Sequence, residues 1–188
     1  MGNQIMSRRV FNASALSAMG LTAACGNGVG SDGAARIDAR VAATLDEMYS
    51  SFPNTVQLGE KANGMLVMPL VTEAGFGFGG GFGRGALLID NTTVDYYSVV
   101  KGSGGLQIGA QQYAHVLFFM TGAALQEFRS SPGWAAGADL EYVISDVGDS
   151  VAADTTTLLA PVLAAVFGRA GLRIGATLEG SKYTRIIP

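Results

Sequence analysis

Ser98 and Lys101 have the spacing of an S-x-x-K motif, and His115 is the only histidine in the chain. In penicillin-binding enzymes that motif works because a helix brings the serine and the lysine to one face. Here the two valines between them and the glycines after Lys101 favour a strand, and the companion motifs S-D-N and K-T-G are absent. A Ser-His-Asp triad would need His115, which lies in an alternating pattern typical of a structural histidine. We therefore expect a non-enzymatic protein, with a hydrolase based on Ser98 or Ser103 as a less favoured alternative.

Other residues that could bind a metal or a cofactor also lack the required partners. Asp146, Asp149 and Asp154 carry oxygen ligands, but their spacing is not that of an EF-hand and turn residues surround them. No Cys/His cluster is present for a transition metal. The glycine run from Gly75 to Gly85 contains GxGxxG-like spacings, yet extended alternation follows where a dinucleotide or P-loop site needs a helix. We expect neither a metal nor a cofactor.

The composition describes a compact apolar domain with few charges. Of 188 residues, 48% are hydrophobic and 14% are charged, and 27 are glycine. Disordered chains have the opposite balance, and collagen requires a glycine at every third position. With 12 basic against 15 acidic side chains there is no positive excess for nucleic acid. The length fits one domain with a short appendage.

The N-terminal segment is predicted to be an export signal. Ser7-Arg8-Arg9-Val10-Phe11 precedes a weakly apolar stretch, which resembles a bacterial twin-arginine signal. Leu21-Thr22-Ala23-Ala24-Cys25 then resembles a lipoprotein lipobox, with threonine where leucine is usual. Ordinary cleavage near Ala24 is the alternative to lipidation of Cys25.

These features predict three regions: a signal peptide over 1–24, a glycine-rich flexible tether over 25–35, and a domain over 36–188. Removing residues 1–24 leaves 10 basic and 15 acidic side chains, a net charge of −5. The expected location is the periplasmic face of the cell envelope, as an outer-membrane lipoprotein.

The domain is predicted to be mainly β with a few helices. One amphipathic helix is expected from Arg36 until Pro53, because apolar residues recur at helical spacing, namely Ile37, Val41, Leu45, Met48 and Phe52. Thr121 is placed to cap a short second helix. About eight short strands between glycine, aspartate and proline breaks indicate an antiparallel barrel or sandwich.

The glycine run has one bare face. Every odd position from 75 to 85 is glycine, whereas three phenylalanines and Arg84 occupy even positions. Because neighbouring side chains on a strand point to opposite faces, the bare face would admit a second backbone or an acyl chain at close range. Alternatively, the glycines permit tight coiling of a small closed sheet.

Several stretches in one order resemble the SYLF domain, a lipid- and actin-binding family: residues 60–69, 74–80, 85–88, 104–111, 119–121, 124–125, 128–129, 171–172 and 178–180. The resemblance implies a non-enzymatic lipid-binding module. Eukaryotic members bind phosphoinositides and some bind actin, whereas bacterial members are mostly exported, so we do not expect actin as a partner. A basic residue is common in the family before Ala74, where this chain has Glu73, and the family's Trp-Ser-x-Pro segment is Tyr97-Ser98-Val99-Val100.

Membrane lipid is thus the expected partner. The hypothesis assigns lipid contact to three aromatic residues, Phe76, Phe78 and Phe82, and headgroup contact to three basic residues, Arg84, Lys61 and Lys101. A small outer-membrane β-barrel or an envelope structural protein is the alternative, since the mature length suffices for eight strands.

Overall fold

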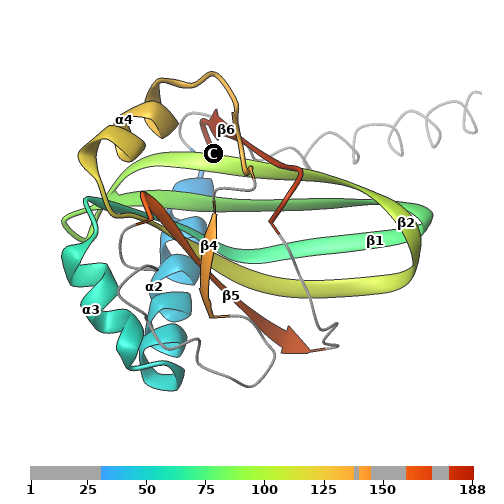
Figure 1. The fold of residues 1–188 in the computed structure, drawn as a ribbon, viewed down its shortest axis with the longest axis horizontal. Coiled ribbons are helices and arrows are strands. Elements are labelled where there is room, and N and C mark those ends of the chain that lie inside the picture. Colours follow the sequence, from blue (N-terminus) through green and yellow to red (C-terminus); the bar gives the residue numbers. More distant parts are fainter. Residues whose placement is uncertain (1–30, 138–139, 145–159, 171–177) are drawn as a thin grey trace, which may run out of the picture.

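The computed structural model describes residues 31–137, 140–144, 160–170 and 178–188. In chain order the helices are α2 (Gly33–Ser51), α3 (Asn54–Lys61) and α4 (Gly122–Ser130). The strands are β1 (Gly64–Ile89), β2 (Thr92–Phe119), β3 (Trp134–Ala135), β4 (Glu141–Ile144), β5 (Val162–Ala170) and β6 (Ser181–Ile186). The strands form one mostly antiparallel sheet in the order β3-β6-β2-β5-β4, with β1 paired to β2 (Figure 1).

Two very long strands dominate the sheet. β1 and β2 pair antiparallel from Ile89↔Thr92 at the turn to Gly64↔Phe119 at the far end. This ribbon bends back on itself, so the first half of β1 lies near its second half (Figure 1). The first part of β2 also pairs with β6, and its last part pairs with β5. The result is a curled sheet that resembles half of a barrel.

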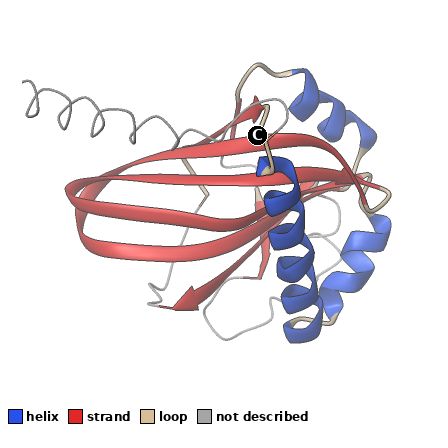
Figure 2. Cartoon of the chain, turned by 180° about the vertical axis from the view of Figure 1, so that it is seen from behind, coloured by secondary structure: helices blue, strands red, loops and turns tan. Residues whose placement is uncertain are grey.

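Alternation along the strands produces two apolar cores, one on each face of the curled sheet. The outer-face core contains Met65, Val67 and Leu88 from β1 and is covered by Val41 and Met48 of α2. Figure 2 shows α2 lying across this outer face. The stripe of apolar residues in α2 therefore packs against the sheet, as expected of an amphipathic helix.

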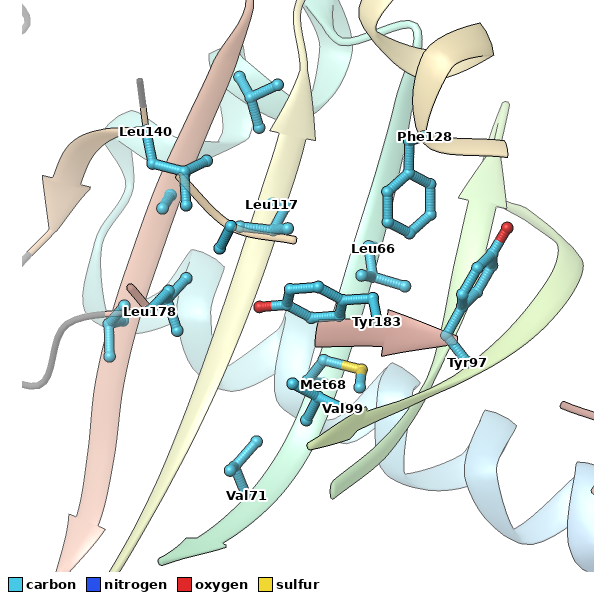
Figure 3. Close-up of a cluster of buried hydrophobic side chains, with 14 of the residues drawn as sticks. Leu66, Met68, Val71, Tyr97, Val99, Leu117, Phe128, Leu140, Leu178 and Tyr183 are labelled. Atoms are coloured by element: carbon cyan, nitrogen blue, oxygen red, sulfur yellow. The ribbon is translucent and has the colours of Figure 1, made fainter. Parts of the chain in front are cut away.

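The inner core fills the hollow of the half-barrel. It includes Leu66, Tyr97, Leu117 and Tyr183, and Phe128 reaches into it from α4 (Figure 3). The start of α4 is well defined, because the Thr121 hydroxyl accepts a hydrogen bond from the Ala124 amide at 3.2 Å. Thr121 is therefore an N-cap, as predicted.

The predicted fold class is confirmed: the protein is mainly antiparallel β with three helices in the described ranges, and a long amphipathic helix comes first. Two details differ from expectation. Pro53 was expected only to end the first helix, but helix α3 begins directly after it. Proline is well accepted at the start of a helix, which explains the difference. The short strands expected between 64 and 119 are two continuous strands of 26 and 28 residues.

Candidate functional site

A buried group of polar side chains lies inside the half-barrel. The Glu73 carboxylate accepts hydrogen bonds from the Tyr113 hydroxyl at 2.7 Å and from Gln111 Nε2 at 2.7 Å. Lys101 Nζ lies 2.9 Å from Glu73 Oε1, and the Lys101 and Glu73 side chains are 9% and 7% exposed, respectively. Every oxygen of this carboxylate thus has a donor, which is how a buried charge becomes tolerable.

The fold explains why these side chains meet. Glu73 lies in the first half of β1 and Lys101 opposite Gly81 in the second half of the hairpin. Bending of the ribbon brings the two halves face to face around the hollow. Burial alone would raise the pKa of Glu73, but hydrogen bonds from Tyr113, Lys101 and Gln111 outweigh it and the pKa is lowered. The carboxylate therefore stays ionised near neutral pH.

His115 is a second buried polar residue of the hollow. Its Nε2 lies 2.9 Å from the Tyr183 hydroxyl, and the residue is fully buried. Burial, and then the charge of Lys101, lower the pKa of His115 to about 3. The imidazole is therefore neutral at ordinary pH and acts in packing, which agrees with the structural role predicted from its strand pattern.

The serine motif has no catalytic geometry. Ser98 and Lys101 both lie in β2, an odd number of residues apart, so their side chains point to opposite faces of the sheet. Lys101 points into the hollow and is paired with Glu73. Within the described ranges there is no group of three or more His, Cys, Asp or Glu side chains that could hold a metal. The Ser103 side chain and Asp146, Asp149 and Asp154 lie outside what the structure describes.

The bare glycine face is occupied by the strand's own first half. A methyl group at Gly83 would lie 2.7 Å from the Leu70 carbonyl oxygen, and one at Gly85 would overlap the Val67 carbonyl. At these positions the glycines allow one backbone to approach another, as coiling of a small sheet requires. The close-approach and coiling interpretations therefore describe the same contact here, and the space is filled by protein.

A groove of about 550 Å³ lies on the outer face, between α2 and the two halves of β1. It is lined by Gly33, Arg36, Ile37, Arg40, Pro69, Leu70, Thr72, Phe82, Gly83 and Arg84. Three of these residues are arginines. Arg36 and Arg40 are four residues apart, so both face the groove from one side of α2. Phe82 and Arg84 come from β1 on the opposite wall.

Phe82 is the exposed aromatic side chain of this groove. It is 50% exposed, and the Arg84 guanidinium carbon lies 5.7 Å from the centre of its ring. The cross-strand partner of Phe82 is Val100, which is 55% exposed. An apolar patch and cationic groups therefore adjoin at one place on the surface.

The structure places the predicted lipid-contacting residues in different surroundings. Phe82 and Arg84 lie together in the groove, whereas Lys101 lies in the hollow and Lys61 is exposed at the end of α3. The other two aromatic residues, Phe76 and Phe78, lie in β1 opposite Ile108 and Gly104, and their side chains are outside the described ones. Cys25, with the whole predicted signal and tether up to residue 30, lies outside the described residues.

Sequence reasoning missed Arg36 and Arg40 as site residues. Both lie outside the apolar stripe of the first helix, and nothing in the sequence shows that this side of the helix borders β1 across a groove. It also missed the interior network of Glu73 and Tyr113. Alternation along a strand places Gln111, Tyr113 and His115 on one face, but their proximity to Glu73 follows from the hairpin register, in which Gln111 lies opposite Glu73.

The described part of the chain is thus a curled sheet with a buried ion pair inside it and a groove on its helix-covered face. Residues 100–185 match the family model Ysc84, described as "Las17-binding protein actin regulator", which corresponds to the SYLF domain. The match runs from within β2 to β6 and confirms the predicted resemblance to that family. No curated protein matches the chain. No helix in the described part of the chain has the length and apolar character needed to cross a bilayer.

Proposed function

We propose that this protein is a non-enzymatic, lipid-binding SYLF module that is exported and held at the cell envelope by its lipidated N-terminus. The observation that carries the lipid part is the outer-face patch of Phe82 and Val100 beside Arg84. Phe82 is half exposed to water, and its transfer to an apolar phase is favourable, by up to about 1.5–3 kcal/mol for full burial of a phenylalanine side chain. An adjacent arginine can remain at the polar headgroup level while its stem follows the apolar surface.

Family membership and sequence support the remaining parts. The family description refers to an actin regulator, and the SYLF resemblance implies membrane lipid as a ligand of the family. The twin-arginine and lipobox patterns support export, and a protein outside the cytoplasm would not ordinarily meet actin. A net charge of −5 after removal of residues 1–24 argues against attraction by bulk charge, so lipid binding has to come from an anchor or a local site.

The lipid part is tested by sedimentation with vesicles of phosphatidylglycerol and phosphatidylcholine, using the mature chain with Cys25→Ser to remove the anchor. Phe82→Ala/Val100→Ala should weaken vesicle binding by about tenfold or more, equivalent to at least about 1.4 kcal/mol. Val56→Ala is the matched control, because Val56 is also a partly exposed valine but lies on α3. Full vesicle binding by a double variant with wild-type circular dichroism would refute the proposal.

The anchoring part needs a separate measurement in cells. Mass spectrometry of the mature N-terminus should find a lipid-modified cysteine at position 25 in the wild type. Arg8→Lys/Arg9→Lys should leave unprocessed precursor in the cytoplasm if the twin-arginine route is used. An unmodified N-terminus produced by cleavage near Ala24 would show that the protein is exported without a lipid anchor.

A further inference from the structure

We infer that the groove between α2 and β1 binds the phosphate-bearing headgroup of an anionic phospholipid, with Arg36, Arg40 and Arg84 as its cationic contacts. This inference rests on the proposed lipid-binding function and assigns a site to it. Two of the three arginines come from a helix that the lipid-binding hypothesis did not include. The groove therefore extends the patch of Phe82 and Val100 into a site with a charged and an apolar part.

The charge pattern favours an anion in this groove. Arg36 and Arg40 are like charges four residues apart on one helix face, an arrangement that destabilises a helix unless an opposite charge intervenes. Arg36 has an ion pair with Asp32 at 2.8 Å, but the two side chains are 60% and 73% exposed. Such exposed pairs contribute about 0–1 kcal/mol, so a phosphate can replace the carboxylate at little cost. Arg84 adds a third guanidinium from the opposite wall.

The apolar walls favour a lipid over free phosphate. Ile37 and Leu70 line the groove together with Phe82, and its volume of about 550 Å³ is within the range of sites for small organic ligands. A free phosphate would use the arginines alone and leave these walls in contact with water. A phospholipid would place its phosphate between the arginines and its glycerol and first acyl carbons against the apolar side chains.

The groove also adjoins the exposed apolar patch of Phe82 and Val100. Phe82 lines the groove and is half exposed beside Val100, so the apolar wall continues directly onto the exposed surface. A lipid could therefore enter the groove from a bilayer that the patch already contacts. The helix wall is fixed in place, because Asp38 of α2 accepts hydrogen bonds from Tyr96 at 2.8 Å and Thr93 at 3.0 Å.

The test uses soluble short-chain lipids, so that headgroup binding is separated from insertion into a bilayer. Calorimetric titration of the mature Cys25→Ser chain would compare dihexanoyl phosphatidylglycerol, dihexanoyl phosphatidylcholine and inorganic phosphate, with both lipids below their micelle concentrations. We expect the phosphatidylglycerol to bind at least about tenfold more tightly than either of the others. Arg36→Gln/Arg40→Gln should weaken its binding by about tenfold or more, whereas Arg129→Gln, on α4 over the other core, should not.

Each other result overturns the inference. Equal affinity for the two lipids would remove the role of net headgroup charge, and equal affinity for inorganic phosphate would remove the role of the apolar walls. Unchanged affinity in the folded Arg36→Gln/Arg40→Gln protein would place the headgroup elsewhere. If that variant and the wild type sediment equally with vesicles, the proposed lipid-binding function stands and only the groove assignment fails. If the wild type binds neither vesicles nor short-chain lipid, both fail.

Discussion

The ammonium of Lys101 lies 2.9 Å from the carboxylate of Glu73, and the two side chains reach each other across the hollow of the half-barrel from opposite halves of one bent hairpin. The resemblance to SYLF domains implies a basic residue before Ala74, where this chain has Glu73. In the structure the negative charge of Glu73 is compensated by Lys101 from the facing half of the hairpin.

Loss of one partner of this pair should be much more damaging than its inversion. Lys101→Met leaves Glu73 buried without its cation and should lower the free energy of unfolding by about 3–5 kcal/mol. Glu73→Lys/Lys101→Glu should recover part of that loss, because the pair is restored with reversed polarity. Urea unfolding followed by the fluorescence of Trp134, the only tryptophan, measures both. A double variant no more stable than Glu73→Lys alone would show that the pair does not couple.

Stability should fall as the pH is lowered from 7 to 5. The folded-state pKa of His115 is depressed to about 3, whereas in the unfolded chain it is near 6.5, so the unfolded state binds more protons in that interval. The stability that neutral His115 contributes is present above pH 6.5 and is lost towards pH 3. Between pH 7 and 5 the loss should be about 2 kcal/mol.

His115→Phe provides the control, because His115 is the only histidine in the chain. This variant loses the contact with Tyr183 and should be less stable at pH 7, but its stability should change little between pH 7 and 5.5. An equally steep pH dependence in the variant would assign the effect to other groups. Below that range Glu73 adds its own acid sensitivity, since its lowered pKa gives stability that is lost as the carboxylate protonates.

Two glycine substitutions should differ sharply in effect. Gly85→Ala places a methyl group onto the Val67 carbonyl and against Met68, so the two halves of β1 must separate. We expect the free energy of unfolding to fall by about 1–3 kcal/mol, as for other overpacked sites. Gly102→Ala has no atom within 4 Å of the new methyl group and should change stability by less than about 0.5 kcal/mol. Equal thermal stability of the two variants would contradict the contact between the halves.

Phe128 should account for most of the stabilisation that α4 provides. Its ring is fully buried and lies 4.7 Å from Tyr97 and 4.8 Å from Phe119, measured between ring centres. Phe128→Ala should lower the free energy of unfolding by about 3–5 kcal/mol, the usual range for truncation of a buried phenylalanine. Gln126→Ala is a better control on the same helix than Leu125→Ala, because Leu125 is partly buried against the inner core whereas Gln126 is exposed. Gln126→Ala should leave the unfolding midpoint in urea unchanged.

Local patterns predicted the elements whose signals are local. The spacing of Ile37, Val41, Leu45 and Met48 predicted α2, and the hydroxyl of Thr121 predicted the start of α4. The alternation around His115 predicted a strand and a structural role for the histidine. In each case the physical cause lies within a few residues, so the sequence is sufficient.

Features that depend on the bend of the hairpin could not be predicted in the same way. In a sequence, glycine and other turn-forming residues indicate the end of a strand. In this structure β1 and β2 continue through such residues at a bend, so two long strands replace the expected short ones. The pairing of Glu73 with Lys101, and the groove that brings Arg36 near Arg84, join residues whose proximity follows only from that bend. Phe82 and Arg84 were predicted because the alternation of one strand places them on the same face.

The alternation of faces along β1 has a consequence for how this domain can change over time. Phe82 and Arg84 extend outward beside the groove, while Gly85 lies against the first half of β1 and Glu73 is paired with Lys101. In this part of the strand, exposed side chains therefore alternate with positions that hold the bent hairpin closed. Substitution of Phe82 or Arg84 would leave the closure of the hairpin intact, whereas insertion of a single residue would exchange the two faces and disrupt both at once.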